Sequence, residues 1–469
     1  MGYSFDRLGF LQFEQLCASL LEQQGGIDAG AWSGEADRCR SVLSGAALAP
    51  PLTRAALPAP VLVQCAWVRD GGWRAAVEAV DTLVADRPED VSVAASYLLL
   101  TNADTPGWAR QALADTVAAH ANAICHRKPR VGVVGAGQLS VLVDASPELR
   151  RAMPSVLGLR DLAQLIDPHL HGRSSLDFEA AAALAPVFVP TSAYRSALQV
   201  LGRHHFAVLT GPPEMGKTAI ARMIGLTQMT TGWEGHECVT PEQLWRRLDP
   251  SRRQLFVADD AFGSTEYRPD SAERWAVQME RILRSLDDSH WLIWTSRPAP
   301  LRAGLGRLHR ERGAERFPAP AEVLVDAAAL DPAEKTLILF RHAKAAELPA
   351  ARRDAIRASG AELVAHPHFT PERIRRLIAA VKSPARGASE LAELSSDALA
   401  DVTEAMSTSF AALGDEHRDL LVAMLDTPAG PVSERDLTAA LRRHHDGALP
   451  HPPAELVDRL TDHFLRVLR

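Results

Sequence analysis

The first third of the chain alternates between apolar residues at helical spacing and short continuous apolar runs. An apolar residue recurs every three or four positions over residues 8–24, and Gly25-Gly26 follows, so the pattern predicts a helix that ends there. Predicted strands then alternate with predicted helices, in the order 61–68, 73–84, 96–101, 107–124, 131–134 and 139–152. This alternation predicts a small α/β domain whose sheet is mostly parallel.

A second alternating region begins near residue 185. Its apolar runs predict buried strands at 206–210, 255–258 and 290–296, with a helix at 270–286. From residue 331 onward the pattern is almost entirely helical, and 383–389 has the small and polar residues of a linker. The chain is therefore predicted to be α/β, with a helical C-terminal region. The predicted domains are 1–157, 185–382 and 395–469.

Composition and charge narrow the classes of function. The 469 residues carry 51 Lys+Arg against 58 Asp+Glu, a net charge of −7, so nucleic-acid binding would need a local basic patch such as 126–130. No apolar run reaches the roughly 18 residues that a membrane span needs, and no signal peptide opens the chain. The five cysteines form no C-x-x-C pair, which favours reduced thiols and a cytoplasmic location.

Residues 211–218, Gly-Pro-Pro-Glu-Met-Gly-Lys-Thr, fit the phosphate-loop pattern G-x-x-x-x-G-K-[ST] between a predicted strand and a helix. In such a loop backbone N–H groups surround phosphate oxygens, the lysine neutralises the β- and γ-phosphates, and the threonine hydroxyl ligates Mg²⁺. The expected nucleotide contacts are Gly211, Pro212, Pro213, Glu214, Met215, Gly216, Lys217 and Thr218. Glu214 is unusual, because its carboxylate must point away from the phosphates or weaken their binding.

Two acids end the next buried strand. Ligands bind at the carboxyl ends of the strands in open α/β sheets, so Asp259 and Asp260 are expected beside the phosphates. We predict that Asp259 holds Mg²⁺ together with Thr218, and that Asp260 orients or activates the attacking water. Arg297 ends the third strand, where a guanidinium suits contact with the γ-phosphate. Arg373 lies in the first turn of a later helix that could close over the nucleotide.

These motifs together resemble one class of ATPase. Residues 185–380 are similar to the P-loop core of STAND ATPases, the signalling class that includes NACHT and NB-ARC proteins, and within it to the bacterial novel STAND type 3 group. The motifs that carry the resemblance are 211–218, 258–263, 294–297 and 368–373. The resemblance implies a slowly hydrolysing switch that uses ATP and Mg²⁺ and forms homo-oligomers on activation.

The same resemblance bears on the end of the chain. It implies a winged-helix region over residues 400–469, followed by a sensor region for an unknown trigger. The sequence stops near the expected wing strand. We therefore expect either a sensor partner on another chain or a longer natural protein.

The N-terminal region resembles a second family. Residues 3–155 are similar to the Mrr-like restriction-endonuclease fold through 5–17, 63–66 and 101–102. That family cuts DNA with an acid that holds Mg²⁺ on one strand and Gln-x-Lys on the next, where the lysine stabilises charge at the phosphate. Here Gln64 matches the glutamine and Ala66 stands at the lysine position, while the acid position falls near 37–41, where Asp37 is displaced and Ser41 stands in its place. Glu14 and Asp37 are the remaining candidates for binding the metal. Alanine supplies no charge, so the resemblance implies a degenerate domain that binds DNA or partners, or relays the state of the ATPase.

Residues 131–140, Val-Gly-Val-Val-Gly-Ala-Gly-Gln-Leu-Ser, imitate a dinucleotide-binding fingerprint. Ser140 stands where the third glycine would be, and no acid follows near 155–158 to bind a ribose. A strand followed by a turn is the better interpretation.

Three hypotheses about function remain open from the sequence. The first is a STAND signalling ATPase in antiviral or stress defence, with a nuclease-like effector domain. The second is an ATP-dependent, type IV-like restriction endonuclease that cuts foreign DNA, which needs the metal site that Ala66 argues against. The third is a regulator or scaffold that holds ATP without measurable hydrolysis and contacts DNA or protein.

Overall fold

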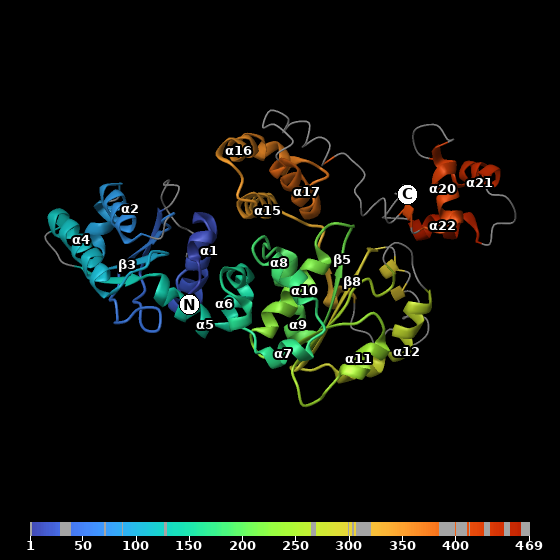
Figure 1. Ribbon diagram of the computed structural model, residues 1–469, viewed down its shortest axis with the longest axis horizontal. Helices are drawn as coiled ribbons and strands as arrows, with labels where there is room; N and C mark the ends of the chain where they lie inside the picture. Colours follow the sequence, from blue (N-terminus) through green and yellow to red (C-terminus); the bar gives the residue numbers. More distant parts are fainter. Residues whose placement is uncertain are drawn as a thin grey trace. The chain divides into compact units, whose positions relative to one another are not determined.

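The computed structural model contains two compact units, Met1–Leu165 and Ile166–Arg469, each with its own sheet (Figure 1). The residues that it describes are 2–28, 39–69, 72–86, 88–125, 129–263, 269–298, 300–302, 304–305, 320–383, 399, 410–411, 413–425, 432–444 and 451–460. Among the helices described, none is both long enough and apolar enough to cross a membrane.

The first unit is built on a four-stranded sheet in the order β1-β2-β3-β4. Its strands are β1 (Cys39–Ser44), β2 (Val61–Ala66), β3 (Ser96–Thr101) and β4 (Arg130–Val134). β1 runs antiparallel to β2, whereas β2, β3 and β4 are parallel to one another. The predicted strands form the parallel part, so the mostly parallel sheet is confirmed. β1 was not predicted, because its sequence Cys-Arg-Ser-Val-Leu-Ser lacks a clear apolar run.

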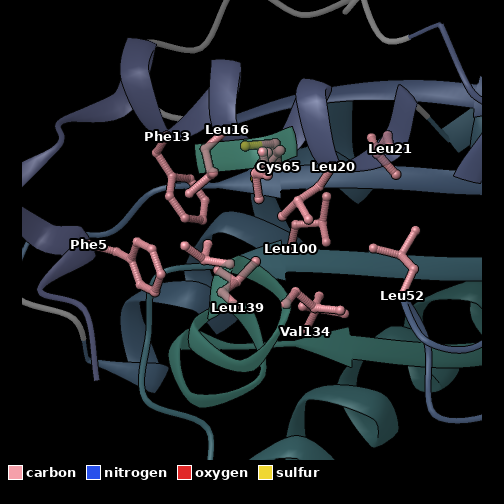
Figure 2. Close-up of a cluster of buried hydrophobic side chains, with 14 of the residues drawn as sticks. Phe5, Phe13, Leu16, Leu20, Leu21, Leu52, Cys65, Leu100, Val134 and Leu139 are labelled. Atoms are coloured by element: carbon pink, nitrogen blue, oxygen red, sulfur yellow. The ribbon is translucent and has the colours of Figure 1, made fainter. Parts of the chain in front are cut away.

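Helices cover both faces of this sheet. The helices of one face are α1 (Phe10–Leu20), α5 (Ala136–Ala145) and α6 (Pro147–Ala152), and those of the other are α2 (Trp73–Asp86), α3 (Pro88–Val93) and α4 (Gly107–Cys125). Side chains alternate along a strand, so Val63 and Cys65 of β2 join the core under α1, while Leu62 and Ala66 join the core under α2. Figure 2 shows the core on the α1 side.

The helical pattern predicted over 139–152 is two helices rather than one. α5 ends at Ala145, and Ser146 caps α6 by accepting at its Oγ a hydrogen bond from the N–H of Leu149 (3.1 Å). Pro147 occupies the first turn of α6, where its missing N–H is not needed. The apolar spacing continues across this break, so periodicity alone does not reveal it.

The second unit is built on a parallel five-stranded sheet in the order β6-β7-β8-β5-β9. Its strands are β5 (Phe206–Thr210), β6 (Glu234–Glu237), β7 (Gln254–Ala258), β8 (His290–Ser296) and β9 (Leu324–Asp326). The three strands predicted from the sequence are confirmed as β5, β7 and β8, while the short strands β6 and β9 were not predicted. β8 lies between β5 and β7, so the carboxyl ends of these three strands are neighbours at one edge of the sheet.

Helices also cover both faces of the second sheet. Gly225 of α10 (Lys217–Met229) faces Leu255, whereas the other face packs against α11 (Pro241–Arg247) and α12 (Pro269–Ser285). Other described helices around this sheet are α7 (Pro168–Arg173), α8 (Phe178–Leu184), α9 (Ser192–His204) and α14 (Pro320–Val323). Trp294, near the end of β8, is buried and meets the rings of Phe206, Phe262 and Trp275 edge-on. These contacts fix the end of β8, where the next residues turn toward the candidate site.

A helical cluster follows the second sheet (orange in Figure 1) and consists of α15 (Pro332–Ala345), α16 (Ala350–Ala365) and α17 (Pro371–Lys382). We call these the lid helices. Ile338, Ile356 and Ile374 contribute one residue from each helix to a shared apolar core. The helical structure predicted from residue 331 onward is therefore confirmed over this segment.

The C-terminal region contains α20 (Asp415–Leu425), α21 (Glu434–His444) and α22 (Pro453–Leu460). Leu420, Leu441 and Leu456 pack together between them. The helical pattern predicted from residue 331 onward is thus confirmed for these described helices as well. The wing strand is expected near the end of the chain, where residues 461–469 lie outside the described residues.

Candidate functional site

The loop between β5 and α10 has a backbone suited to binding an anion. Gly211, Glu214 and Gly216 have positive φ angles of 148°, 67° and 83°. A Cβ on Gly211 would lie 3.3 Å from the backbone nitrogen of Ala328, so the close approach of that segment favours glycine. Gly216 is the N-cap of α10, whose positive end therefore adjoins the loop. Backbone N–H groups in such mixed conformations form concavities that hold phosphate groups.

Lys217 places a positive charge at this loop. Its Nζ donates hydrogen bonds to the carbonyl oxygens of Gly211 (2.8 Å) and Pro212 (2.7 Å), and the residue is buried. Burial lowers the pKa of Lys217 to about 8, against the raising effect of Asp260 and with a further lowering by Arg297. A desolvated ammonium gains from an anionic partner, so the loop and its lysine fit a phosphate group.

A network of hydroxyl groups and one carboxylate joins the first turn of α10 to the ends of β7 and β8. Thr218 Oγ1 donates to Asp259 Oδ1 (2.8 Å), and Thr295 Oγ1 donates to the same oxygen. Ala258 pairs with Trp294 in the last register pair of β7 and β8, which sets Asp259 beside Thr295 one residue further on. Carboxylate and hydroxyl oxygens suit a hard cation, so this group fits Mg²⁺.

Thr295 is a candidate site residue that was not predicted from the sequence. In the sequence it belongs to the motif 294–297. The signal that identifies it is its position, since it occupies on β8 the place that Asp259 occupies on β7. Thr295 can be identified in this way only once β7 and β8 are known to be neighbouring strands.

Asp260 and Arg297 lie beside this network. The N–H of Asp260 donates to Thr295 Oγ1 (2.9 Å), and Asp260 has a φ of 48°, a left-handed conformation that is uncommon outside glycine. Burial lowers the pKa of Arg297, and the negative charge of Asp260 opposes this lowering. The positive charge of Arg297 also lowers the pKa of Lys217. The structure therefore brings Asp260, Arg297 and the loop lysine into one electrostatic neighbourhood.

Arg373 also reaches the loop, but its partner there is the loop's own carboxylate. Arg373 lies in the first turn of α17, where the N-cap Thr370 accepts at Oγ1 a hydrogen bond from its N–H (3.2 Å). Its Nε lies 3.6 Å from Glu214 Oε2, and the two side chains are only 10% and 6% exposed. Its Nη1 donates to the carbonyl oxygen of Leu399. The carboxylate of Glu214 is thus turned toward the lid helices.

The nuclease-like candidates of the first unit divide between the two faces of its sheet. Ser41 lies opposite Gln64 in the antiparallel pair of β1 and β2, and residues opposite one another share a face. Gln64 donates from Nε2 to the carbonyl oxygen of Ala79 (2.9 Å) and accepts a hydrogen bond from the hydroxyl of Tyr97. With Ala66, these side chains face α2, α3 and α4.

Glu14 is a residue of α1, the helix that covers the opposite face of the sheet. Its Oε2 pairs with Arg40 Nε at 3.3 Å, and Arg40 stands opposite Cys65, whose side chain belongs to the α1 core. Burial raises the pKa of Glu14, and the charge of Arg40 opposes the rise. The sheet therefore separates Glu14 from Gln64 and Ala66.

Asp37 lies outside the described residues. In the part of the chain that the structure describes, no group of three His, Cys, Asp or Glu side chains is placed to hold a metal ion. Three of the cysteines, Cys17, Cys65 and Cys238, are free and buried, which confirms the prediction of reduced thiols for them.

The glycine-rich segment 131–140 forms a strand, a turn and a helix. β4 ends at Val134 and α5 begins at Ala136. A Cβ on Gly135 would lie 2.0 Å from Thr105 Oγ1, so tight packing explains this glycine. Ser140 Oγ donates to the carbonyl oxygen of Ala136 (2.9 Å) and accepts from the N–H of Tyr3 (3.2 Å). The predicted strand and turn are confirmed, and Gly135 and Ser140 both have packing roles.

Comparison with known proteins finds one family model that is similar to the central region. Residues 188–345 match the family model described as Novel STAND NTPase 3. The match includes the phosphate loop, β7 with its two acids and β8 with Arg297, and it supports a P-loop NTPase of the STAND type. It stops short of Arg373 and covers neither the first unit nor the C-terminal helices. No curated protein matches the chain.

Three solved structures show distant similarity to the chain. A Walker-type ATPase of Pyrococcus abyssi is 12% identical, with 59% of this chain and 92% of that chain covered and a TM-score of 0.35. PCH-2 of C. elegans is 12% identical over 51% and 70% of the two chains, with a TM-score of 0.28. The FIGL-1 AAA domain, solved with ADP, is 17% identical over 59% and 91%, with a TM-score of 0.27. At TM-scores this low, these similarities support no conclusion about function.

Proposed function

We propose that the protein is an ATP-binding switch of the STAND type that hydrolyses ATP slowly. The observation that carries the proposal is the meeting of Lys217, Thr218, Asp259 and Thr295 at the neighbouring carboxyl ends of β5, β7 and β8. The family match over 188–345 supports the same class. ATP is proposed over GTP because the resemblance favours it.

Each site residue has a proposed role. The loop 211–218 holds the phosphates, with Lys217 against the β- and γ-phosphates, and Thr218 and Asp259 hold Mg²⁺. Mg²⁺ neutralises charge on the phosphates when it is bound. Asp260 orients the attacking water, and Arg297 stabilises the charge that develops on the transferred phosphoryl group.

The regions before and after the nucleotide-binding core are proposed to form separate domains. We propose domains at 1–157, 185–382 and 395–469, with a degenerate Mrr-like domain first and a winged-helix-like region last. The first domain would contact DNA or a partner and change with the nucleotide state, in antiviral or stress defence. A trigger, sensed through another chain or segment, would favour a homo-oligomer. The division of Glu14 from Gln64 and Ala66 across the sheet supports a degenerate domain over a working nuclease.

The restriction-endonuclease alternative meets a second obstacle. Ala66, at the position where the related nucleases carry lysine, is buried in the core under α2. A lysine there would bring an uncompensated charge into that core, so Ala66→Lys is expected to destabilise the fold rather than to restore cutting.

The proposed function is tested by single-turnover phosphate release from Mg²⁺-ATP. The native protein should release phosphate slowly, and Asp260→Asn should slow release by about 100-fold or more while binding ATP with unchanged affinity. Asp288→Asn is the matched control, because Asp288 precedes β8 with a side chain that is 99% exposed. Binding without release by the native protein would favour the scaffold hypothesis, and no binding would refute both.

A further inference from the structure

The phosphate loop contains a buried acid that its proposed role as a phosphate cradle does not require. Glu214 occupies a left-handed backbone position with a φ of 67°, which costs a non-glycine residue about 1 kcal/mol. Its side chain is 6% exposed. A negative charge so close to a phosphate site, in a conformation that glycine would adopt freely, calls for a physical explanation.

The surroundings of Glu214 provide only partial compensation for its charge. Oε2 lies 3.6 Å from Arg373 Nε, at ion-pair distance but beyond a hydrogen bond. Oε1 is buried and accepts no hydrogen bond from any residue that the structure describes. A buried carboxylate normally needs both a close partner and hydrogen bonds to offset its desolvation. The pair is therefore held in place but weakly satisfied, which makes it easy to exchange for a better one.

Arg373 couples this acid to a larger body. It lies in the first turn of α17, whose Ile374, Leu377 and Ile378 pack in the shared core of the lid helices. Its Nη1 is anchored on the carbonyl oxygen of Leu399. If this guanidinium changed its partner, α17 would shift as a whole, because the helix is packed into the core of the lid helices.

We propose that Glu214 is a positioning residue that holds Arg373 beside the phosphate loop and competes for it with the terminal phosphate of ATP. This inference rests on the proposed ATP site. A guanidinium pairs more strongly with a doubly charged phosphate that offers hydrogen-bond acceptors than with a carboxylate 3.6 Å away. ADP lacks that phosphate and leaves Arg373 to Glu214. The pair thereby sets how well the site distinguishes ATP from ADP, and in which nucleotide state α17 is held by the loop.

The test is a double-mutant cycle read out as nucleotide affinity rather than turnover. Affinities for ADP and for a non-hydrolysable ATP analogue are measured by calorimetry with Mg²⁺ for the native protein, Glu214→Gln, Arg373→Gln and the double variant. Removing the competing acid should tighten binding of the ATP analogue by about tenfold and of ADP by about twofold or less. In the Arg373→Gln background the additional gain for the ATP analogue should disappear, since the guanidinium being competed for is absent.

Controls separate this effect from general electrostatics and from misfolding. Glu372→Gln removes an acid that pairs with Arg375 (2.6 Å) on the same helix and should leave both affinities unchanged. Glu214→Gly keeps the positive φ without strain and should reproduce the effect of Glu214→Gln if that variant folds poorly. Hydrogen exchange over 371–382 should respond to the ATP analogue more than to ADP in the native protein, and equally little in Arg373→Gln.

Two results would overturn the inference. Equal gains for ADP and the ATP analogue in Glu214→Gln would mean that the acid acts only by repelling phosphates. A gain that survives in Arg373→Gln would mean that Arg373 is not the group in competition. If the native protein binds neither nucleotide, the proposed function itself fails, which is a different outcome from either of these.

Discussion

The sequence indicates a candidate site on each of the two sheets, but the candidate side chains meet in the second unit and are separated in the first. In the second unit, Thr218, Asp259 and Thr295 come from three separate elements and meet through hydrogen bonds. In the first unit, Glu14 of helix α1 and Gln64 of strand β2 lie on opposite sides of one sheet. Residues that follow the carboxyl ends of neighbouring parallel strands come close together wherever the strands pair. Residues within a strand meet a partner only in one register, because a shift of one residue moves a side chain to the other face of the sheet.

The largest effect that would sharpen this comparison is expected from Asp259→Asn. Losing the carboxylate that receives Thr218 and Thr295 should reduce ATP hydrolysis by about 100- to 1,000-fold, because the metal loses its charged ligand. Steady-state phosphate release measures this. Glu14→Gln in the first unit should leave the rate unchanged, and equal losses in both variants would end the contrast between the two sites.

A pH titration should give the next largest effect. The pKa of Lys217 is lowered by burial to about 8, so the free protein loses this charge above that pH and the dissociation constant for ATP should rise by up to about tenfold per pH unit. The free energy of unfolding should change in the other direction from the affinity and increase as the pH rises. The cost of burying the charged lysine is fully present below pH 8 and is relieved as the pH rises toward the ordinary lysine value of 10.5.

Lys217→Arg provides the check on that titration. Arginine stays charged across the range, so the affinity of the variant should be independent of pH between 7 and about 10, whatever its absolute value. A native profile that is equally flat would show that Lys217 does not titrate in this window.

A smaller effect is expected at Thr295. Thr295→Val keeps the shape of the side chain and removes the hydroxyl that binds Asp259 and receives the N–H of Asp260, so hydrolysis should fall by about tenfold. Thr336→Val is the control, because the hydrogen bond that Thr336 makes in the described part of the chain stays within its own helix, to the carbonyl oxygen of Pro332 (2.7 Å). Similar rates in the two variants would remove Thr295 from the site.

The smallest effect is expected at the first unit's acid. Arg40, the partner of Glu14, is 38% exposed, so solvent screens the pair and Glu14→Gln should change the free energy of unfolding by about 1 kcal/mol or less. Denaturant unfolding measures this. The native protein with Mg²⁺ should also leave plasmid DNA intact, and cutting that Glu14→Gln abolishes would contradict the separation across the sheet.

The sequence predicts these two regions to different depths for physical reasons. The phosphate loop is a contiguous motif between a strand and a helix, so its position follows from local pattern alone. The contact of Asp259 with Thr295 depends on β7 and β8 being neighbours, which a single sequence does not state. The pair of Glu214 and Arg373 joins residues far apart in the chain, and no local pattern announces it.

The N-terminal candidates show the converse limit. Residues of a nuclease-like motif can be aligned along the chain, but the side of the sheet on which each lies is a tertiary property. Glu14 belongs to α1, which covers one face, whereas Gln64 and Ala66 of β2 point to the other. The place of Ser41 opposite Gln64 depends on β1, a strand without a strong apolar run. Similar reasoning explains why one predicted helix is two, since a cap and a proline at Ser146 and Pro147 act without changing apolar spacing.

The most direct measurement of the central claim is a calorimetric titration of the protein with a non-hydrolysable ATP analogue and Mg²⁺. The account predicts measurable binding to the native protein, weaker by at least about tenfold in Lys217→Ala, because that residue loses a charge-assisted contact with the phosphates. Lys382→Ala, at the exposed end of α17, should bind as the native protein does. Equal affinity of Lys217→Ala and the native protein would contradict the assignment of the loop as the ATP site.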